Sequence, residues 1–427
     1  MRVLLTGTTG FIGRHLHKAL LKQGHEVVAC ARRHPGLPCT AFIPGDFNAD
    51  LSPEIWRPRL DGIEVVINAV GIIRETRDQH FQPLHTDAPN ALFNACTQAG
   101  IQRVIQISAL GADEQAETPY HLSKRAADDY LVEQPLDWLI LRPSLIYGSG
   151  SASSELFAGL AALPVTPLIG DGDGDQKIQP IHIDDLVRAV LVALNTRVAI
   201  RQRIDCVGPA PLSLKHWLAG WRRWLNATPM RTLPVAYGLS GVASRLFAPF
   251  SRLPVDADSL SMLQRGNAAP VEPFIKTFGF QPLGFEQWAT HAPANTAERQ
   301  QARLFFLWPL LRVCLAFMWI WTGLTSAFFH PVGDSYQMLS AVGLSGIALP
   351  IALYTAALLD ALLGLALLLN IRLRQVLATQ LAMMLGYSLI LSISLPEFWF
   401  HPFGPVSKNL PLIAATLMLF VREGDAK

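Results

Sequence analysis

The opening residues VLLTGTTGFIG constrain the fold more tightly than any other stretch of the chain. A continuous apolar run that ends in glycine is typical of a strand buried on both faces of a parallel sheet. Gly7, Gly10 and Gly13 follow at intervals of three and lead into a helical pattern of apolar residues, after which HEVVACARR gives a second strand. This order suits a dinucleotide pyrophosphate, because glycines let the backbone approach and a helix N-terminus offers free N–H groups. We therefore predict a nucleotide site at this turn.

The end of the second strand bears on the choice of cofactor. An acidic residue there would bind the ribose 2′-OH of NAD, whereas an arginine accommodates the 2′-phosphate of NADP. This strand ends in Ala31, Arg32 and Arg33, and no acid follows until Asp46. The pattern favours NADP(H) over NAD(H); the alternative is that the two arginines are solvated surface residues.

Further apolar runs end in small or polar residues, with helical patterns between them: VVINAVG at 65–71, VIQIS at 104–108 and DWLILRPSLIYG at 137–148. The alternation predicts an α/β fold with a Rossmann-type doubly wound parallel sheet, in which ligands bind beyond the carboxyl ends of the strands. The residues at such ends are Asp46, Phe47, Asn68, Ala69, Val70, Gly71, Ser108, Arg142, Pro143 and Ser144. These positions are where adenine, ribose and nicotinamide would lie.

Tyr120 and Lys124 follow Ser108 and are four residues apart, so a helix would place them on one face. A nearby ammonium favours phenolate, and we expect Lys124 to lower the pKa of Tyr120 toward a range useful for acid/base catalysis. The same lysine can hydrogen-bond a ribose, and Ser108 can orient a substrate oxygen. The three residues form a candidate catalytic set.

The motifs TGxxGFIG, YxxxK and RPSxxYG together resemble the extended or atypical short-chain dehydrogenase/reductase superfamily, which is NAD-dependent epimerase/dehydratase-like, across about residues 1–290. VVINAVGIIRET, ISALGAD and QPIHIDDLVRAV resemble in particular the branch that includes the nucleotide-binding accessory subunit of respiratory complex I. The resemblance implies that Tyr120 is the acid/base and that Lys124 contacts the nicotinamide ribose. The cofactor-binding residues we predict are Gly7, Thr9, Gly10, Phe11, Ile12, Gly13, Arg32, Arg33, Asp46, Phe47, Asn68, Ala69, Val70, Gly71, Tyr120, Lys124, Arg142, Pro143 and Ser144.

One departure from the family pattern leaves two functions open. Active extended members commonly carry further Ser or Thr residues after the fifth strand, whereas Ser108 is followed by Ala109, Leu110 and Gly111. The complex I relative, moreover, holds its cofactor in a structural role. The chain is therefore either an NAD(P)-dependent oxidoreductase or epimerase-like enzyme, or a non-catalytic NADP(H)-binding structural or redox-sensing module of a membrane complex.

The C-terminal part is far less charged than the rest. Residues 305–427 hold 11 of the 68 charged residues, about 9% of that segment, beside a typical value of about 25%. Four apolar stretches, at about 304–329, 347–370, 375–395 and 402–421, approach the roughly 20 residues that cross a bilayer. Lys and Arg flank these stretches only on the side of the N-terminal domain, which predicts a multi-pass plasma (inner) membrane protein with that domain and both termini in the cytoplasm.

Two charges interrupt the apolar stretches, Asp360 in the second and Lys408 in the fourth. Counted from the inner arginines they lie at similar depths, so we expect them to form a functional pair inside the membrane. The alternative is that Lys408 reaches the outer headgroups. HPFGPVSKNLPLIAATLMLF resembles the DoxX-like four-span family, and some members of that wider group are tied to sulfur or quinone redox chemistry. A third function left open is that the spans carry the activity.

The remaining features set limits. A net charge of +2 indicates no nucleic-acid surface. The five cysteines have no metal spacing, and DGDGD (171–175) lacks the glutamate of a calcium loop, which leaves Ile183 in its place, so no metal site is predicted. Residues 233–254 are either a lid over the substrate or an interfacial helix.

We predict a domain at 1–290 (cofactor part about 1–150, substrate part about 150–290), a linker at 291–303 and a membrane domain at 304–427. The expected partners are a small-molecule or lipid-soluble substrate and the membrane.

Overall fold

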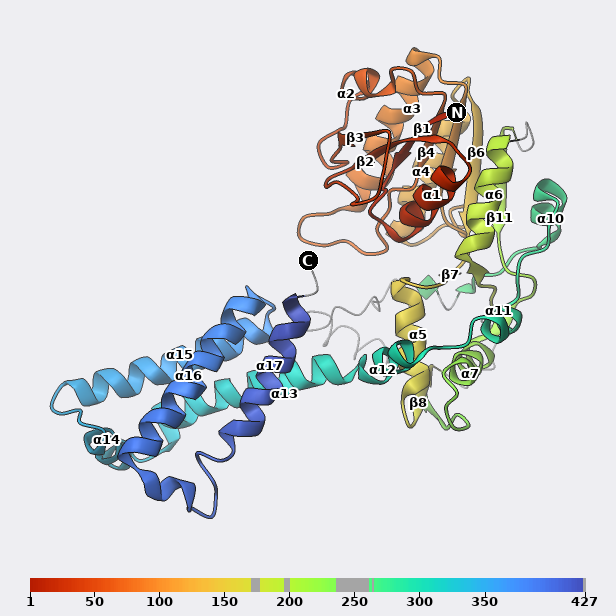
Figure 1. The fold of residues 1–427 in the computed structure, drawn as a ribbon. Coiled ribbons are helices and arrows are strands. Elements are labelled where there is room, and N and C mark those ends of the chain that lie inside the picture. Colours follow the sequence, from red (N-terminus) through yellow and green to blue (C-terminus); the bar gives the residue numbers. More distant parts are fainter. Residues whose placement is uncertain (170–176, 196–199, 236–260, 263–264, 425–427) are drawn as a thin grey trace. The chain divides into compact units, whose positions relative to one another are not determined.

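The computed structural model describes residues 1–169, 177–195, 200–235, 261–262 and 265–424 (Figure 1). Packing divides these residues into two compact units that meet along the chain between Ala302 and Arg303. Each unit is described by itself.

A seven-stranded parallel sheet forms the centre of the N-terminal unit. Its strands, in spatial order, are β11 (Gln202–Cys206), β6 (Asp137–Pro143), β5 (Arg103–Ile107), β4 (Val65–Asn68), β1 (Arg2–Thr6), β2 (Glu26–Ala31) and β3 (Ala41–Pro44). The chain runs outward from β1 in one direction through β2 and β3, and in the other from β4 to β11. The strand order therefore reverses between β1 and β4, where a doubly wound sheet binds its ligands. The predicted fold class is confirmed.

Helices cover both faces of this sheet, as alternation along the buried strands requires. Val3 and Leu5 of β1 point to one face and pack with α1 (Phe11–Lys22), α6 (Ile183–Asn195) and α10 (Glu272–Phe278). Leu4 points to the other face and packs with α2 (Pro53–Trp56), α3 (Ala88–Ala99) and α4 (Pro119–Val132). The two apolar layers hold the carboxyl ends of the strands in fixed relative positions. Short turns of 3₁₀-helix η1 (Arg57–Leu60) and π-helix η2 (Gln82–Asp87) precede β4 and α3.

The rest of the N-terminal unit packs around a third apolar cluster, which includes Tyr147, Trp217 and Phe285. Three two-stranded sheets occur here among the described residues: β7 (Ile146–Tyr147) with β10 (Ile181–His182), β9 (Lys177–Ile178) with β12 (Leu212–Ser213), and β8 (Thr166–Ile169) with β13 (Thr232–Val235). The helices are α5 (Ala152–Ala162), α7 (Leu214–Trp224), α11 (Phe285–His291) and the start of α12 (Thr296–Leu304). DGDGD at 171–175, and residues 236–254 of the predicted lid or interfacial helix, lie outside the described residues.

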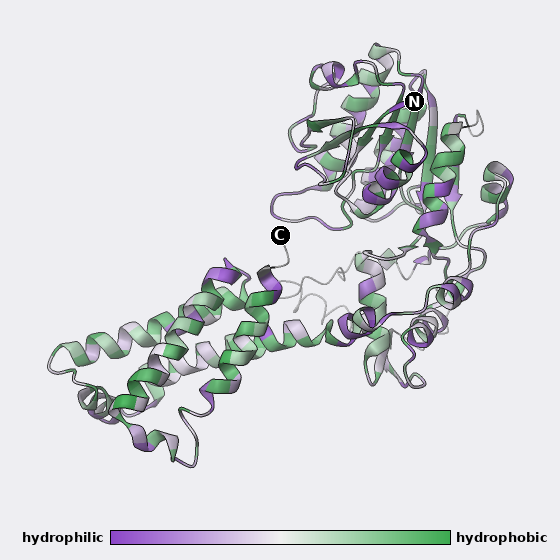
Figure 2. Cartoon of the chain, in the orientation of Figure 1, coloured by the Kyte–Doolittle hydropathy of each residue, from purple (hydrophilic) through white to green (hydrophobic). Residues whose placement is uncertain are grey.

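The C-terminal unit is helical and apolar along most of its length (Figure 2). Its elements are α13 (Leu307–Leu324), η3 (Thr325–Phe329), α14 (Val332–Ala341), α15 (Ala348–Leu368), α16 (Leu373–Ser394), η4 (Pro396–Trp399) and α17 (Asn409–Gly424). Among the described residues, three helical stretches are long and apolar enough to cross a membrane: Thr296–Phe329, whose first residues belong to the N-terminal unit, Ala348–Leu368 and Leu373–Ser394. We conclude that this unit is a membrane domain.

The fourth predicted span, at 402–421, needs correction. α17 begins only at Asn409 and has 16 residues, which is short of the roughly 20 needed to span the hydrocarbon core. Pro402 and Pro405 lack backbone N–H donors, and Gly404 adopts a φ of 55° between them, so a helix cannot run through this stretch. The bundle keeps a fourth helix, but a shorter one than predicted.

The predicted pair of Asp360 and Lys408 does not form. Asp360 is buried on α15, and its Oδ1 has no hydrogen-bond partner in the part of the chain that the structure describes. Lys408 is exposed in the turn before α17 rather than inside a span, and no ion pair joins the two residues in the described part of the chain. The late start of α17 is the reason, since it leaves Lys408 outside the helix. Its exposure agrees with the alternative that Lys408 reaches the headgroups.

Candidate functional site

A cleft of about 250 Å³ opens where the strand order reverses. It is lined by the glycine turn after β1, by the ends of β2, β3 and β4, and by the segment leading to η2. The residues lining it are Gly7, Thr9, Gly10, Cys30, Ala31, Arg32, Gly45, Asp46, Phe47, Ala69, Val70, Gly71, Ile72, Gln79 and Leu84. Nine of the predicted cofactor-binding residues thus line one cavity.

The glycine turn is as tight as the sequence suggests. Gly7 has a φ of 71°, and a Cβ added there would lie 2.7 Å from the Ala69 carbonyl oxygen. A Cβ on Gly13 would lie only 2.0 Å from the Gly7 carbonyl oxygen, so α1 packs directly on the turn. Gly10 precedes α1 and offers no capping side chain, which leaves N–H groups of the first helical turn available to an anion. This cradle fits a dinucleotide pyrophosphate.

Arg32 lies exposed at the rim of the cleft, directly after β2. Its guanidinium faces Gln79, whose amide oxygen, in the orientation that satisfies both groups, accepts bonds of 3.1 and 3.3 Å. The Asp46 backbone N–H donates to Asp50, and Asp50 is held by Arg59 at 2.6 Å. The rim therefore carries one cation with a polar neighbour, and Asp46 stays exposed beside Phe47.

Several predicted cofactor residues have other partners. Asn68 accepts a hydrogen bond from Thr6 at 2.6 Å and donates to Gln106 at 2.8 Å, so its side chain crosslinks β1, β4 and β5. Arg142 pairs with Asp205 of β11 at 2.7 Å, and the Ser144 hydroxyl donates to a backbone carbonyl. A position at the carboxyl end of a strand does not by itself place a side chain on the cleft wall, because side chains there also pair across neighbouring strands. The predicted residues that do not line the cleft are Phe11, Ile12, Gly13, Arg33, Asn68, Tyr120, Lys124, Arg142, Pro143 and Ser144.

Lys124 joins the ends of two strands. Its buried ammonium donates hydrogen bonds of 3.2 Å to the carbonyl oxygens of Val70 and Ile107, which follow β4 and end β5. A Cβ added to Gly71 would lie 3.0 Å from Nζ. Burial lowers the pKa of Lys124 to about 8. The cation is therefore fixed beside the part of the cleft that Val70 and Gly71 line.

Tyr120 lies in the first turn of α4, because Thr118 caps that helix and Pro119 begins it. Its ring packs against Phe81 and His85 at centroid distances of 5.9 and 5.6 Å. Burial, together with the negative charge of Asp128, raises the pKa of Tyr120 to about 12. The expectation that Lys124 lowers this pKa was wrong, because burial and the negative charge of Asp128 both disfavour the phenolate. At neutral pH the phenol carries its proton.

The Ser108 hydroxyl, which we predicted to orient a substrate oxygen, is hydrogen-bonded to another side chain. Its buried hydroxyl donates a hydrogen bond of 2.5 Å to Oδ2 of Asp128. Burial raises the pKa of Asp128 to about 7. Asp128 comes four residues after Lys124 on α4, so the polar spacing Tyr120, Lys124, Asp128 was a signal in the sequence that we did not use.

His85 was missed by the sequence analysis. Its Nε2 accepts from the Ile72 N–H at 3.0 Å, and its Nδ1 lies 2.9 Å from the Ser123 hydroxyl, which itself donates to the Tyr120 carbonyl. These bonds require a neutral ring protonated at Nδ1. Burial, and then Lys124, lower the pKa of His85 to about 2. His85 and Ser123 are 38 residues apart, so no local pattern could have joined them.

Comparison with known proteins identifies the two parts of the chain. Residues 3–206 match the NAD dependent epimerase/dehydratase family, and residues 316–417 match the DoxX-like family. The N-terminal part is thus similar to the epimerase/dehydratase family and the C-terminal part to the DoxX-like family. The predicted fusion is confirmed.

Curated relatives are similar to the chain over just under half of its length. The chain is 31% identical to a ceramide reductase of Caulobacter vibrioides over 202 residues, 46% of this chain and 62% of the relative. It is 30% identical to the mitochondrial NADH dehydrogenase [ubiquinone] 1 alpha subcomplex subunit 9 of Arabidopsis thaliana over 198 residues, 44% of this chain and 48% of the relative. In both cases the chain spans less than two thirds of the relative's length.

Solved structures share the fold of the epimerase/dehydratase domain. A short-chain dehydrogenase/reductase superfamily protein from Agrobacterium tumefaciens, with bound NAD, aligns with a TM-score of 0.54 and 16% identity, covering 72% of this chain and 99% of that one. UDP-glucuronic acid 4-epimerase from Bacillus cereus, in complex with UDP-glucuronic acid and NAD, aligns with a TM-score of 0.51 and 21% identity, covering 71% and 100%. At these identities the likeness concerns the fold alone.

Proposed function

We propose that the epimerase/dehydratase domain binds NADP(H) in the cleft between β1 and β4 and acts as a membrane-anchored oxidoreductase. The glycine turn would hold the pyrophosphate, and Arg32 would face the 2′-phosphate of the adenosine ribose, since no carboxylate ends β2. Ala69, Val70 and Gly71 would lie along the cofactor. When bound, the nicotinamide supplies hydride transfer.

The observation that carries this proposal is the position of Lys124. Its ammonium is held by the carbonyls of Val70 and Ile107 beside Gly71, and Tyr120 lies one helical turn before it. A nicotinamide ribose at Gly71 would be within reach of the remaining Nζ donor. The Tyr120 phenol has no hydrogen-bond partner among the described residues, which leaves Oη available to a ligand.

The protonated state of Tyr120 leads us to favour reduction of a substrate over its oxidation. A phenol with its pKa raised to about 12 can donate a proton at neutral pH but does not accept one readily. Tyr120 would therefore protonate the oxygen of a substrate carbonyl as hydride reaches the carbon. Reduction of a ketone or aldehyde suits this site better than oxidation of an alcohol.

A lipid-soluble substrate is the class that we favour. The domain is fused to membrane helices, and one relative is named for the reduction of a lipid, ceramide. Arg303 precedes α13, and Arg372 and Arg374 lie at the turn between α15 and α16, so we place the catalytic domain on the cytoplasmic side of the inner membrane. Both termini lie on that side when the shorter helix α17 also crosses the bilayer.

The experiment compares two tyrosines of α4. The full chain in detergent is given NADPH and a panel of long-chain ketones, and NADPH consumption is followed. Tyr120→Phe should lower turnover at least 100-fold while the Kd for NADPH changes less than two-fold. Tyr130→Phe, which removes a hydroxyl that accepts a hydrogen bond from Asn94 of α3, is the matched control and should retain turnover.

A second candidate function is a non-catalytic NADP(H)-binding module of a membrane redox complex. The bond between Ser108 and Asp128 favours it, because the hydroxyl that would orient a substrate is already occupied. Relatives named as NADH dehydrogenase subunits also favour it. If NADPH raises the melting temperature but wild type and Tyr120→Phe consume it equally slowly with every ketone, this second function replaces the first.

A further inference from the structure

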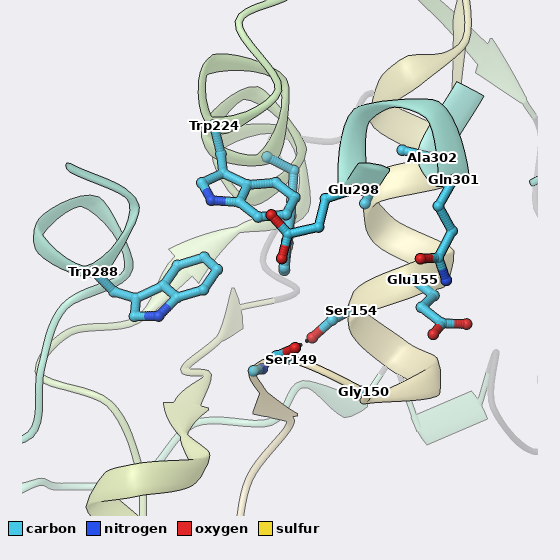
Figure 3. Close-up of a pocket in the computed structure, with 12 residues that line it drawn as sticks. Ser149, Gly150, Ser154, Glu155, Trp224, Trp288, Glu298, Gln301 and Ala302 are labelled. Carbon is cyan, nitrogen blue, oxygen red and sulfur yellow. Dashed lines mark hydrogen bonds between the residues drawn. The ribbon is translucent and has the colours of Figure 1, made fainter. Parts of the chain in front are cut away.

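A second cavity of the N-terminal unit lies among α5, α7, α11, α12 and the loop after β7 (Figure 3). Its walls share no residue with the cofactor cleft. The residues lining it are Gly148, Ser149, Gly150, Ser154, Glu155, Ala158, Trp221, Trp224, Trp288, Glu298, Gln301 and Ala302. The cavity combines three indoles with two carboxylates, a composition that the proposed oxidoreductase chemistry does not use.

The indoles form a rigid apolar wall. Trp224 and Trp288 stack at a centroid distance of 5.5 Å and an interplanar angle of 26°, and Trp221 stands edge-on to Trp224 at 5.2 Å. The Trp224 indole N–H donates to the Ala292 carbonyl at 2.7 Å, which fixes that ring. Trp221 is 1% exposed, and its indole N–H has no partner among the described residues. This donor would suit an acceptor elsewhere on the ligand, such as a hydroxyl or phosphate oxygen, rather than the ammonium group itself.

The two carboxylates come from different helices. Glu155 lies in the first turn of α5. Glu298 extends from α12 toward Trp224 (Figure 3), and its Oε2 also accepts the Asn295 N–H at 2.9 Å. Across the described ranges, neither carboxylate pairs with a lysine or an arginine. This wall of the cavity is therefore negatively charged.

Two arginines that follow the indole Trp221 on α7 already have partners. Arg222 follows Trp221 on α7, and its buried guanidinium donates to the carbonyls of Ala161, Leu163 and Thr228. Arg223 pairs with Glu286 on the exposed side. Neither arginine is available to neutralise Glu155 or Glu298.

We propose that this cavity binds an organic ammonium group. Indole faces attract a cation through their quadrupole, and they suit a weakly hydrated alkylammonium because carbon surfaces cannot replace the water shell of a metal ion. Carboxylates at the edge add charge-assisted hydrogen bonds or simple attraction. No cluster of three or more metal-ligating side chains occurs among the described residues, so the donor set favours an ammonium over a metal.

The cavity lies close in sequence to the first membrane helix. Ala302 lines it, and the apolar helix α13 begins five residues later at Leu307. The ammonium can come from a lipid headgroup such as phosphatidylethanolamine or from a soluble amine.

The test uses the full chain and follows tryptophan fluorescence during titration with choline. We expect saturable binding, and we expect 3,3-dimethyl-1-butanol, the uncharged isostere of choline, to bind at least ten-fold more weakly. The double variant Glu155→Gln with Glu298→Gln should weaken choline binding about ten-fold. The Glu298→Gln change keeps a side-chain oxygen that can accept the Asn295 N–H, so the start of α12 is preserved. Glu114→Gln, an exposed glutamate elsewhere, is the matched control.

Two sets of nanodiscs identify the source of the ammonium. If phosphatidylethanolamine discs raise the choline concentration needed for half-saturation relative to phosphatidylglycerol discs, the lipid headgroup occupies the cavity. If the two sets give the same value, a soluble amine is the ligand. Equal binding of choline and its uncharged isostere, or unaltered binding in the double glutamine variant, would overturn the ammonium site. Because neither readout involves NADPH, these outcomes are independent of the proposed oxidoreductase.

Discussion

The Ser108 hydroxyl donates a hydrogen bond of 2.5 Å to Oδ2 of Asp128, and both side chains are buried. Ser108→Ala should lower the free energy of unfolding by about 1.5–3 kcal/mol, since a buried bond to a carboxyl group is lost. Turnover should fall far less than in Tyr120→Phe, because the hydroxyl is committed to Asp128.

Chemical unfolding of the full chain checks this value. The variants Ser108→Ala, Asp128→Ala and the double variant form a cycle whose coupling should be about 1 kcal/mol or more, since alanine leaves no acceptor for the hydroxyl. A coupling near zero would show that the bond does not stabilise the fold, and Ser108 would then return as a candidate for substrate orientation.

Gly13→Ala tests the glycine cradle. The added methyl group would meet the Gly7 carbonyl oxygen at 2.0 Å, and neither backbone segment can yield without opening the turn. We expect a loss of at least about 3 kcal/mol of stability or, if the domain still folds, no stabilisation by NADPH in a thermal-shift measurement. Gly333→Ala is the control, because a Cβ there has no atom within 4 Å. A Gly13→Ala chain that binds NADPH normally would refute the assignment of the pyrophosphate site.

Arg32 and Arg33 provide a matched pair for cofactor choice. Both are exposed, but only Arg32 lines the cleft. Arg32→Ala should weaken NADPH binding about ten-fold or more and leave NADH binding nearly unaltered, whereas Arg33→Ala should change neither. Isothermal titration with both nucleotides measures this. Equal losses for NADPH and NADH in Arg32→Ala would refute the contact with the 2′-phosphate.

His85 predicts an acid dependence of stability. Burial lowers its pKa from 6.5 to about 2, so between these values the unfolded chain binds a proton that the folded chain does not. Stability therefore falls as pH falls below about 6.5, by as much as about 1.4 kcal/mol per pH unit. Unfolding midpoints between pH 7 and 5 should show a shallower slope in His85→Phe, even though that variant is less stable because the Ile72 N–H loses its acceptor. Parallel slopes would mean that His85 does not stay neutral.

The cofactor cleft was largely predictable from local sequence. Gly7 and Gly10 closely follow β1 in the sequence, so the glycine turn is recognised from neighbouring residues alone. Arg32 is recognised in the same way, because it directly follows β2. The carboxyl ends of parallel strands meet at one edge, so Ala69, Val70 and Gly71 were expected beside the glycine turn. The length of the apolar stretches likewise predicts the membrane helices.

The electrostatics of the site depended on the tertiary structure. A sequence gives the spacing of Tyr120 and Lys124, but the sign of a pKa shift depends on desolvation and on charges from other elements. Asp128 and His85 come close to the strand ends only when α4 packs there. Arg142 forms its ion pair with Asp205 only because β11 pairs with β6. Lys408 lies outside a span because Pro402, Gly404 and Pro405 delay α17. The sequence by itself determined the elements and the edge of the sheet where a ligand binds. Only packing between elements distant in the chain decided which polar groups remain free there, because burial and through-space contacts are not local properties.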